Sequence, residues 1–135
     1  MSTPIGRIHH VGYLVKDIKK SITAFSSLGF SMRGDVMFDP DRNADICFMY
    51  PPAGEVVELV SPNKDSDIFP LLKKFNNAPY HICYEVEDLA HAIEYLKAKG
   101  FLLFKEPQRA MAISNSAQVA FLMHTRMGMI ELVQL

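Results

Sequence analysis

The sequence predicts an α+β fold in which two tandem β-α-β-β-β modules form an open, barrel-like curved sheet, with the helices on its convex side. Two internal repeats support this prediction. The stretch IHHVGYLVKDI returns as YHICYEVEDL, which carries His10 onto His81, and VVELV returns as MIELV, which carries Glu58 onto Glu131. Each repeated unit covers half of the chain, so the repeats indicate a duplicated module and not a solenoid.

The first module begins with a predicted strand over Ile8–Val15, which is rich in β-branched and aromatic residues. Asp17 is a candidate helix N-cap, and Gly29 suits the left-handed position that ends a helix. An apolar stripe at helical spacing lies between them: Ile18, Ile22 and Phe25. Three shorter strands are expected after the helix, separated by turn-rich stretches: Phe30–Met37, Asp45–Tyr50 and Val56–Val60.

The second module repeats each of these signals. Asp88 is its candidate N-cap and Gly100 its candidate helix end, and the apolar stripe between them consists of Leu89, Ile93 and Leu96. The strands that follow are expected at Phe101–Lys105, Gln118–Met123 and Met129–Val133. Because cap, stripe and stop agree between the two halves, each half is predicted to fold in the same order.

Domain organisation follows from this repeat. We expect one domain over residues 1–135, built of a first module at residues 5–62 and a second module at residues 79–135. Residues 63–78 connect them, with a short helix over Ser66–Asn76 in which Pro70 is tolerated only in the first turn.

Composition excludes several classes of protein. Hydrophobic residues make up 49% of the chain and the net charge is −1, so neither nucleic acid nor an anionic membrane is expected as a partner. The start of the chain lacks the apolar region of a signal peptide, and no run approaches the length of a membrane span. We therefore expect a cytoplasmic protein, in which Cys47 and Cys83 are buried free thiols.

Two histidines and two glutamates are the candidate site residues. His10 and His81 share a strand face with a small neighbour, Gly12 or Cys83, which leaves room beside each ring. Glu58 and Glu131 lie in apolar runs, where a lone carboxylate neutralises or finds a partner. The pseudo-twofold symmetry of the repeat brings the four side chains to one axis. Two imidazoles and two carboxylates suit one divalent cation and leave coordination positions open.

Taken one at a time, none of these four residues would be expected to bind a metal. A histidine in a strand is more often a core residue, and a glutamate there is usually solvated. Four symmetry-matched positions favour the ligand set, but the other candidates keep their ordinary reading. His9 is expected in the core, His91 on the surface and His124 in a loop. Arg42, Arg109 and Arg126 are expected in loops, solvated or holding an anionic end of a substrate. Phe48 and Phe121 are expected in the core.

Over nearly its whole length the chain resembles the vicinal oxygen chelate superfamily, which includes glyoxalase I, methylmalonyl-CoA epimerase, extradiol dioxygenases and bleomycin-resistance proteins. The motifs are HHVGYLVKDI, VELVSP, PYHICYEVEDL and AFLMHTRMGMIELVQ. This resemblance implies one divalent transition metal per site (Ni, Co, Zn or Mn), held by His10, Glu58, His81 and Glu131. It also implies a small-molecule substrate and a homodimer.

The resemblance further implies proton transfer next to a metal-chelated carbonyl, through an enediolate. Glu131 would be the base, and Glu58 its opposite partner or a ligand. A lyase or isomerase of the glyoxalase I type, acting on a hemithioacetal, is the main prediction. Leu14 stands where bacterial glyoxalases place a glutathione-holding arginine.

Three alternatives remain open. The first is an epimerase of the methylmalonyl-CoA type, acting on an acyl thioester, which ELVSP and AFL echo although the usual glycine-rich loop is replaced by AMAISNS. The second is a metal-free protein that binds a drug or metabolite; the ligand quartet and the absence of tryptophan disfavour it. The third, a ring-cleaving dioxygenase, needs only two histidines and one carboxylate and ranks lowest.

Overall fold

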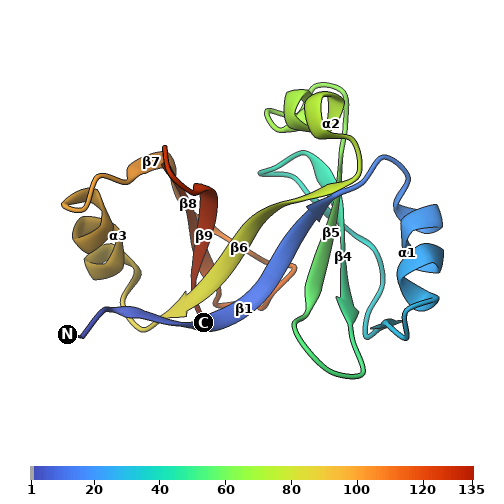
Figure 1. Cartoon of the computed structure of the whole chain (residues 1–135), viewed down its shortest axis with the longest axis horizontal. Helices are drawn as coiled ribbons and strands as arrows, with labels where there is room; N and C mark the ends of the chain where they lie inside the picture. Colours follow the sequence, from blue (N-terminus) through green and yellow to red (C-terminus); the bar gives the residue numbers. More distant parts are fainter. Residues whose placement is uncertain (1) are drawn as a thin grey trace. The chain divides into compact units, whose positions relative to one another are not determined.

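The structure is a computed structural model that describes residues 2–135, and its fold is mixed α+β, as predicted (Figure 1). These residues form two compact units: the first unit consists of residues 10–80, and the second unit consists of residues 2–9 and 81–135. Each unit is described by itself below.

In the first unit the hydrogen-bonded strand order is β2-β4-β5-β1, and β3 also pairs with β4, at residues 44–46, whereas β2 pairs with it at residues 49–50. The elements are β1 (Ile5–Leu14), α1 (Ile18–Ser26), β2 (Ser31–Met32), β3 (Met37–Asp39), β4 (Ala44–Tyr50), β5 (Val57–Pro62) and α2 (Phe69–Phe75). Strands β1 and β5 are parallel, and β4 and β5 are antiparallel. The single strand predicted at Phe30–Met37 is instead two short strands, because the intervening residues do not pair with β4.

Helix α1 begins and ends where the sequence signals indicated. The Asp17 carboxylate accepts a hydrogen bond from the backbone N–H of Lys20 over 3.1 Å, and Gly29 has a positive φ of 92°. The helix packs its apolar stripe on β4 and β5. The buried residues of this core are Val15, Ile18, Cys47, Met49, Val57 and Leu59.

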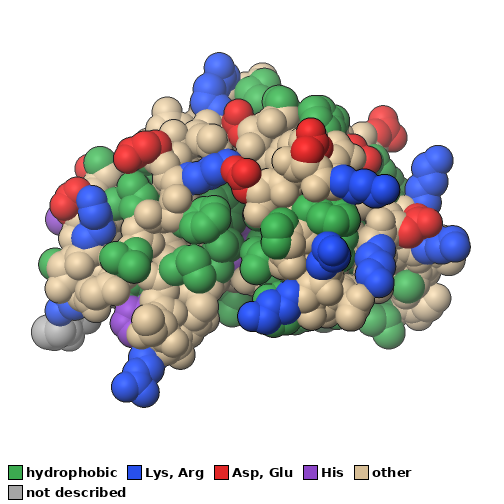
Figure 2. Space-filling model, turned by 90° about the horizontal axis from the view of Figure 1, so that it is seen from above, with side chains coloured by type: hydrophobic (Ala, Val, Ile, Leu, Met, Phe, Trp, Pro, Cys, Tyr) green, Lys and Arg blue, Asp and Glu red, His purple; other side chains and the backbone are tan. Residues whose placement is uncertain are grey.

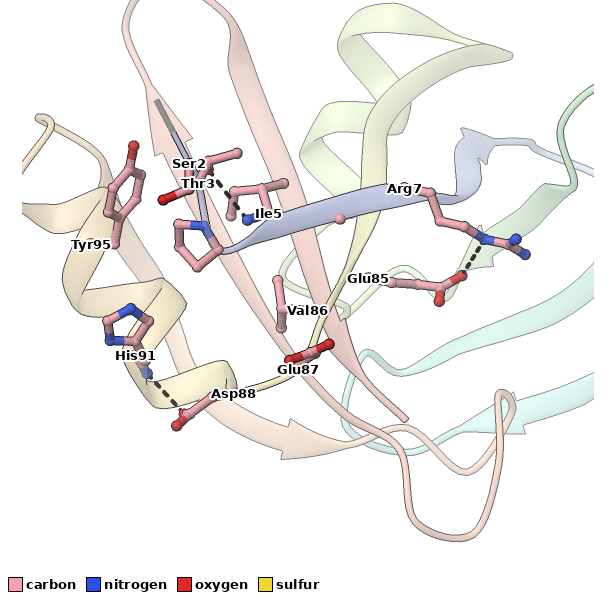
Figure 3. A pocket seen from close by; sticks show the side chains of 12 residues that line it. Ser2, Thr3, Ile5, Arg7, Glu85, Val86, Glu87, Asp88, His91 and Tyr95 are labelled. Atoms are coloured by element: carbon pink, nitrogen blue, oxygen red, sulfur yellow. Dashed lines mark hydrogen bonds and ion pairs between the residues drawn. The ribbon is translucent and has the colours of Figure 1, made fainter.

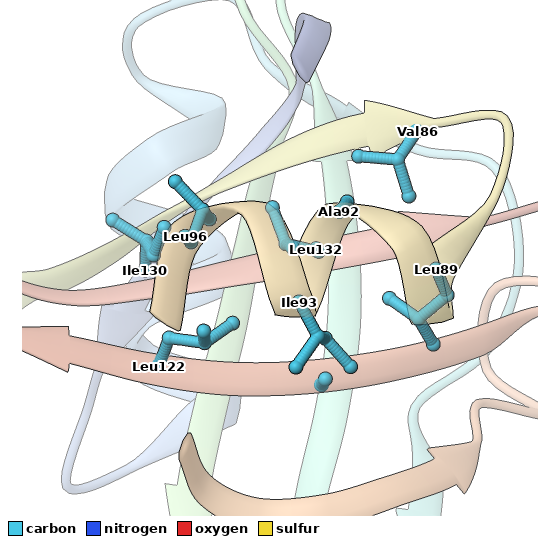
Figure 4. Packing of buried hydrophobic residues seen from close by; sticks show 9 residues of the cluster. Val86, Leu89, Ala92, Ile93, Leu96, Leu122, Ile130 and Leu132 are labelled. Atoms are coloured by element: carbon cyan, nitrogen blue, oxygen red, sulfur yellow. The ribbon is translucent and has the colours of Figure 1, made fainter. Parts of the chain in front are cut away.

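The second unit repeats this construction with the strand order β6-β9-β8-β7. Its elements are β6 (Ala78–Val86), α3 (Leu89–Lys97), β7 (Leu102–Arg109), β8 (Gln118–His124) and β9 (Gly128–Gln134). Asp88 caps α3 through the backbone N–H of His91, over 3.0 Å. Figure 4 shows Ile93 and Leu96 of α3 directed at the strands, where they pack on Leu122, Ile130 and Leu132.

The start of the chain belongs to the second unit. Ile5 packs against the α3 core, and Arg7 Nε lies 3.1 Å from Glu85 Oε2 (Figure 3). Gly6 approaches β6 so closely that a Cβ atom there would lie 2.7 Å from the carbonyl oxygen of Glu85. The packing boundary therefore falls inside β1, at a place that the repeat in the sequence does not mark.

The surface agrees with the near-neutral composition. Acidic and basic side chains are interspersed on the face shown in Figure 2, with hydrophobic side chains exposed among them. Within residues 2–135, none of the helices has the length and apolar character that crossing a bilayer requires. Both cysteines are free and buried, as predicted.

Candidate functional site

His10 and Glu58, which we call the first pair, lie on neighbouring strands of the first unit. His10 Nε2 is 3.4 Å from Glu58 Oε1, and both side chains are completely buried. Their closeness follows from the parallel register of β1 and β5, in which Gly12 is the partner of Glu58. On the other side of β5, Phe48 is the partner of Glu58, and its ring stands edge-on to His10 with centroids 5.3 Å apart.

His81 and Glu131, the second pair, have the same arrangement in the second unit. His81 Nε2 is 3.0 Å from Glu131 Oε1, and both residues are buried. Cys83 is the register partner of Glu131 on one side, and Phe121 is its partner on the other. The Phe121 ring stands edge-on to His81, again at 5.3 Å. Gly12 and Cys83, the small residues expected beside the two histidines, are therefore the register partners of the two glutamates.

Arg42 lies in the turn before β4, in a loop as expected, and contacts Glu58 of the first pair. It was expected as a solvated loop cation or a holder of a substrate anion, yet its side chain is only 11% exposed. Its Nη1 and Nη2 atoms donate to Oε1 and Oε2 of Glu58, over 3.1 and 2.9 Å. Its Nε atom donates to Oδ2 of Asp39 over 2.8 Å. The two acidic residues of DPDRN that precede Arg42 gave the signal for a short-range ion pair, but nothing in the sequence pointed across to β5.

The arginine decides the electrostatics of the first pair. Burial alone would raise the pKa of Glu58, but the charge of Arg42, the charge of His10 and their hydrogen bonds together hold the pKa well below its ordinary value. Glu58 is therefore a carboxylate under ordinary conditions and a weak proton acceptor.

The remaining candidates lie outside the two pairs. His91 is exposed and His9 is half-buried. His124 was expected in a loop but is the last residue of β8, where its ring packs on Phe101 with centroids 4.7 Å apart. Arg109 was expected in a loop but is the last residue of β7, where it donates to the backbone carbonyl of Asn115 over 2.8 Å. Arg126 lies in the exposed turn between β8 and β9, as expected.

An open groove of about 830 Å³ lies between the start of the chain and α3 in the second unit (Figure 3). It is lined by residues 2–7, residues 85–88, His91 and Tyr95. None of the four predicted ligands lines this groove, so we do not assign it to the site of the two pairs.

The donor chemistry of the two pairs fits a divalent metal. Each pair offers a ring nitrogen and a carboxylate oxygen within hydrogen-bonding range of each other, buried away from water. Imidazole and carboxylate are ligands of first-row divalent ions, and a buried carboxylate requires a positive partner. Arg42 already supplies one such partner to Glu58.

Two β-α-β-β-β halves that each carry a buried histidine–glutamate pair define a protein of the vicinal oxygen chelate class. The family model described as the Glyoxalase/Bleomycin resistance protein/Dioxygenase superfamily matches residues 9–121, and the chain belongs to that superfamily. This confirms the resemblance inferred from the motifs.

Among curated proteins, the chain is similar to the ethylmalonyl-CoA/methylmalonyl-CoA epimerase of Cereibacter sphaeroides. The two are 33% identical over 99 residues, which make up 71% of this chain and 72% of the relative.

Solved structures show the same fold. Methylmalonyl-CoA epimerase from Mycobacterium tuberculosis has a TM-score of 0.84 at 22% identity, with 99% of this chain and 91% of that chain covered. A hypothetical protein from Bacillus halodurans has a TM-score of 0.81 at 26% identity, covering 96% and 94%. A variant of Streptomyces coelicolor methylmalonyl-CoA epimerase, in complex with 2-nitronate-propionyl-CoA, has a TM-score of 0.79 at 20% identity, covering 96% and 97%.

Proposed function

We propose that the protein is a metal-dependent epimerase that moves a proton at the carbon next to the carbonyl of an acyl-CoA thioester. The observation that carries this proposal is the likeness to the Cereibacter sphaeroides epimerase over 71% of the chain. It favours the epimerase of the methylmalonyl-CoA type, one of the alternatives expected from the sequence, over the glyoxalase I type.

The first and second pairs would hold the metal, with His10, Glu58, His81 and Glu131 as its ligands. The support for this assignment is the equivalence of the two pairs in register, burial and aromatic neighbour. When bound, a divalent ion supplies Lewis-acid stabilisation of the negative charge that develops on the thioester oxygen.

Glu131 is our candidate for the base that takes the proton from carbon. The choice between the two glutamates rests on their partners. Both oxygens of Glu58 accept from Arg42, and its lowered pKa makes it a poor proton acceptor. Glu131, like Glu58, has a neighbouring imidazole: His81 lies 3.0 Å from it and orients the carboxylate. Glu58 is accordingly assigned the role of ligand alone.

Solvent deuterium exchange tests this function. The protein, loaded with Co²⁺, is incubated in D₂O with methylmalonyl-CoA and, separately, with the hemithioacetal of methylglyoxal and glutathione. We expect deuterium to enter the acyl-CoA at the carbon between its two carbonyl groups, as followed by NMR, and to stop entering when the metal is chelated.

The other outcomes separate the alternatives. Turnover of the hemithioacetal without exchange into the acyl-CoA would restore the glyoxalase reading. If neither substrate exchanges and titration shows no saturable metal binding, the enzyme reading fails and a binding protein remains.

A further inference from the structure

Arg42 forms two hydrogen bonds with the carboxylate of Glu58, which is a metal ligand in the proposed function. We propose that Arg42 competes with the divalent cation for Glu58, so that this arginine weakens and thereby sets the metal affinity of the site. The inference deepens the proposed function and rests on it, because it concerns the same ligand.

The geometry of the contact makes the competition direct. The two terminal nitrogens of Arg42 address the two oxygens of Glu58 separately, at 3.1 and 2.9 Å, in the parallel fork that guanidinium and carboxylate form. The oxygen lone pairs of Glu58 that accept these two hydrogen bonds cannot at the same time bind a metal ion. A guanidinium does not lose its proton in a protein, so its charge repels an approaching cation at every ordinary pH.

Arg42 is also held where it is. Asp39 accepts from its Nε atom at 2.8 Å, and the Ser66 hydroxyl donates to its backbone carbonyl at 2.5 Å. Asp39 Oδ1 further accepts from the backbone N–H of Asp41 at 2.9 Å, which fixes the turn. Because these hydrogen bonds hold both the side chain and the backbone of Arg42, the arginine cannot leave Glu58 by a change of its side-chain rotamer alone.

The second pair offers the contrast within the same chain. Glu131 has the same kinds of register partner as Glu58, a small residue and a phenylalanine, and it lies 3.0 Å from the imidazole of His81. An imidazole can turn to the metal as a ligand in its own right, whereas a guanidinium cannot. The competition that we propose therefore concerns the two hydrogen bonds from Arg42 to Glu58.

Calorimetric titration with Co²⁺ tests the proposal on the full chain. We expect Arg42→Gln to bind Co²⁺ more tightly than the unmodified protein, on the order of 10- to 100-fold, the range by which residues behind metal ligands change affinity. Arg42→Lys should lie between them, because an ammonium is a point charge and cannot occupy both oxygens as a fork. Arg109→Gln removes the same charge from the exposed end of β7 and is the matched control.

Two further measurements keep the test decisive. The gain in Co²⁺ affinity caused by Arg42→Gln should vanish when Glu58 is also replaced. The double variant Arg42→Gln with Glu58→Gln should therefore bind Co²⁺ no more tightly than Glu58→Gln alone. Circular dichroism of each metal-free variant checks that the fold is retained, and Arg42→Lys carries the test if Arg42→Gln does not fold.

Equal or weaker Co²⁺ binding by the folded Arg42 variants would overturn the competition and make Arg42 a support of Glu58 as ligand. A gain that persists in the double variant would also overturn it. If the unmodified protein and all variants bind no Co²⁺, the metal site of the proposed function fails, and with it the competition.

Discussion

His81 Nε2 lies 3.0 Å from Oε1 of Glu131, and both side chains are buried at the centre of their strands. The contact fixes the direction of the carboxylate without adding a permanent positive charge, in contrast to the fork of Arg42 on Glu58. This difference between two otherwise equivalent carboxylates is the basis for assigning different roles to them.

The first prediction concerns Glu131. Glu131→Gln keeps the size of the side chain but removes its ability to accept a proton, so kcat on methylmalonyl-CoA should fall by about 10²- to 10⁴-fold. Substrate affinity, measured by calorimetry, should change far less. Glu94→Gln, on an exposed helix position, is the control and should leave both unchanged. Comparable turnover by Glu131→Gln would assign the proton transfer to another group.

The second prediction concerns stability in acid. The pKa of Glu58 is lowered in the folded state, so below about pH 4.3, the ordinary value for an unfolded glutamate, the unfolded chain binds more protons at this position. The contribution of Glu58 is therefore present above that pH and is lost as the pH falls through the lower, folded pKa. Urea unfolding between pH 7 and pH 3 should show a smaller acid-side slope for Glu58→Gln than for the unmodified protein. Parallel curves would contradict the lowered pKa.

The third prediction concerns the two thiols. Burial, with a smaller contribution from Asp35, raises the pKa of the Cys47 thiol, and Cys83 is completely buried. Because the thiolate is the reactive form, neither cysteine should react readily with Ellman's reagent in the folded protein at pH 8. Both should react at once in 6 M guanidinium chloride. Rapid labelling of either thiol before unfolding would show that its strand opens to solvent.

The fourth prediction concerns the contact between the start of the chain and β6. A methyl group at Gly6 would meet the carbonyl oxygen of Glu85 at 2.7 Å, a backbone atom that cannot turn aside. Gly6→Ala should therefore lower the free energy of unfolding by about 1–3 kcal/mol, the usual cost of overpacking. Gly34→Ala meets no atom within 4 Å and serves as the matched control. Equal urea midpoints for the two variants would mean that residues 2–9 are not held against β6.

Local signals in the sequence predicted most of the secondary structure. Asp17 and Asp88 cap their helices as expected, since a cap depends on residues only three positions away. The two histidines and two glutamates could be proposed as site residues because each occurs at the matching position of both repeats. The boundary of the units within β1 was not predictable in this way, because a repeat records the order of elements and not which core each strand covers.

The Arg42–Glu58 contact shows the other limit of sequence reasoning. Periodicity and turn signals describe neighbours along the chain, whereas this ion pair joins a loop to a strand that the sheet brings alongside. A charged residue in a turn is usually solvated, so the ordinary expectation for Arg42 was the wrong one. Its half-buried state depends on Asp39 and Ser66, which hold the loop from two sides.

The place of residues 2–9 in the second unit bears on how this protein is made. The core that receives Ile5 includes Leu122 and Leu132, which are synthesised more than 100 residues after it. Residues 2–9 therefore stay uncovered until β8 and β9 have been synthesised, and contacts between positions so distant in the sequence slow folding. A fragment beginning at residue 79 would lack this segment and would leave the part of the α3 core that Ile5 covers open to water.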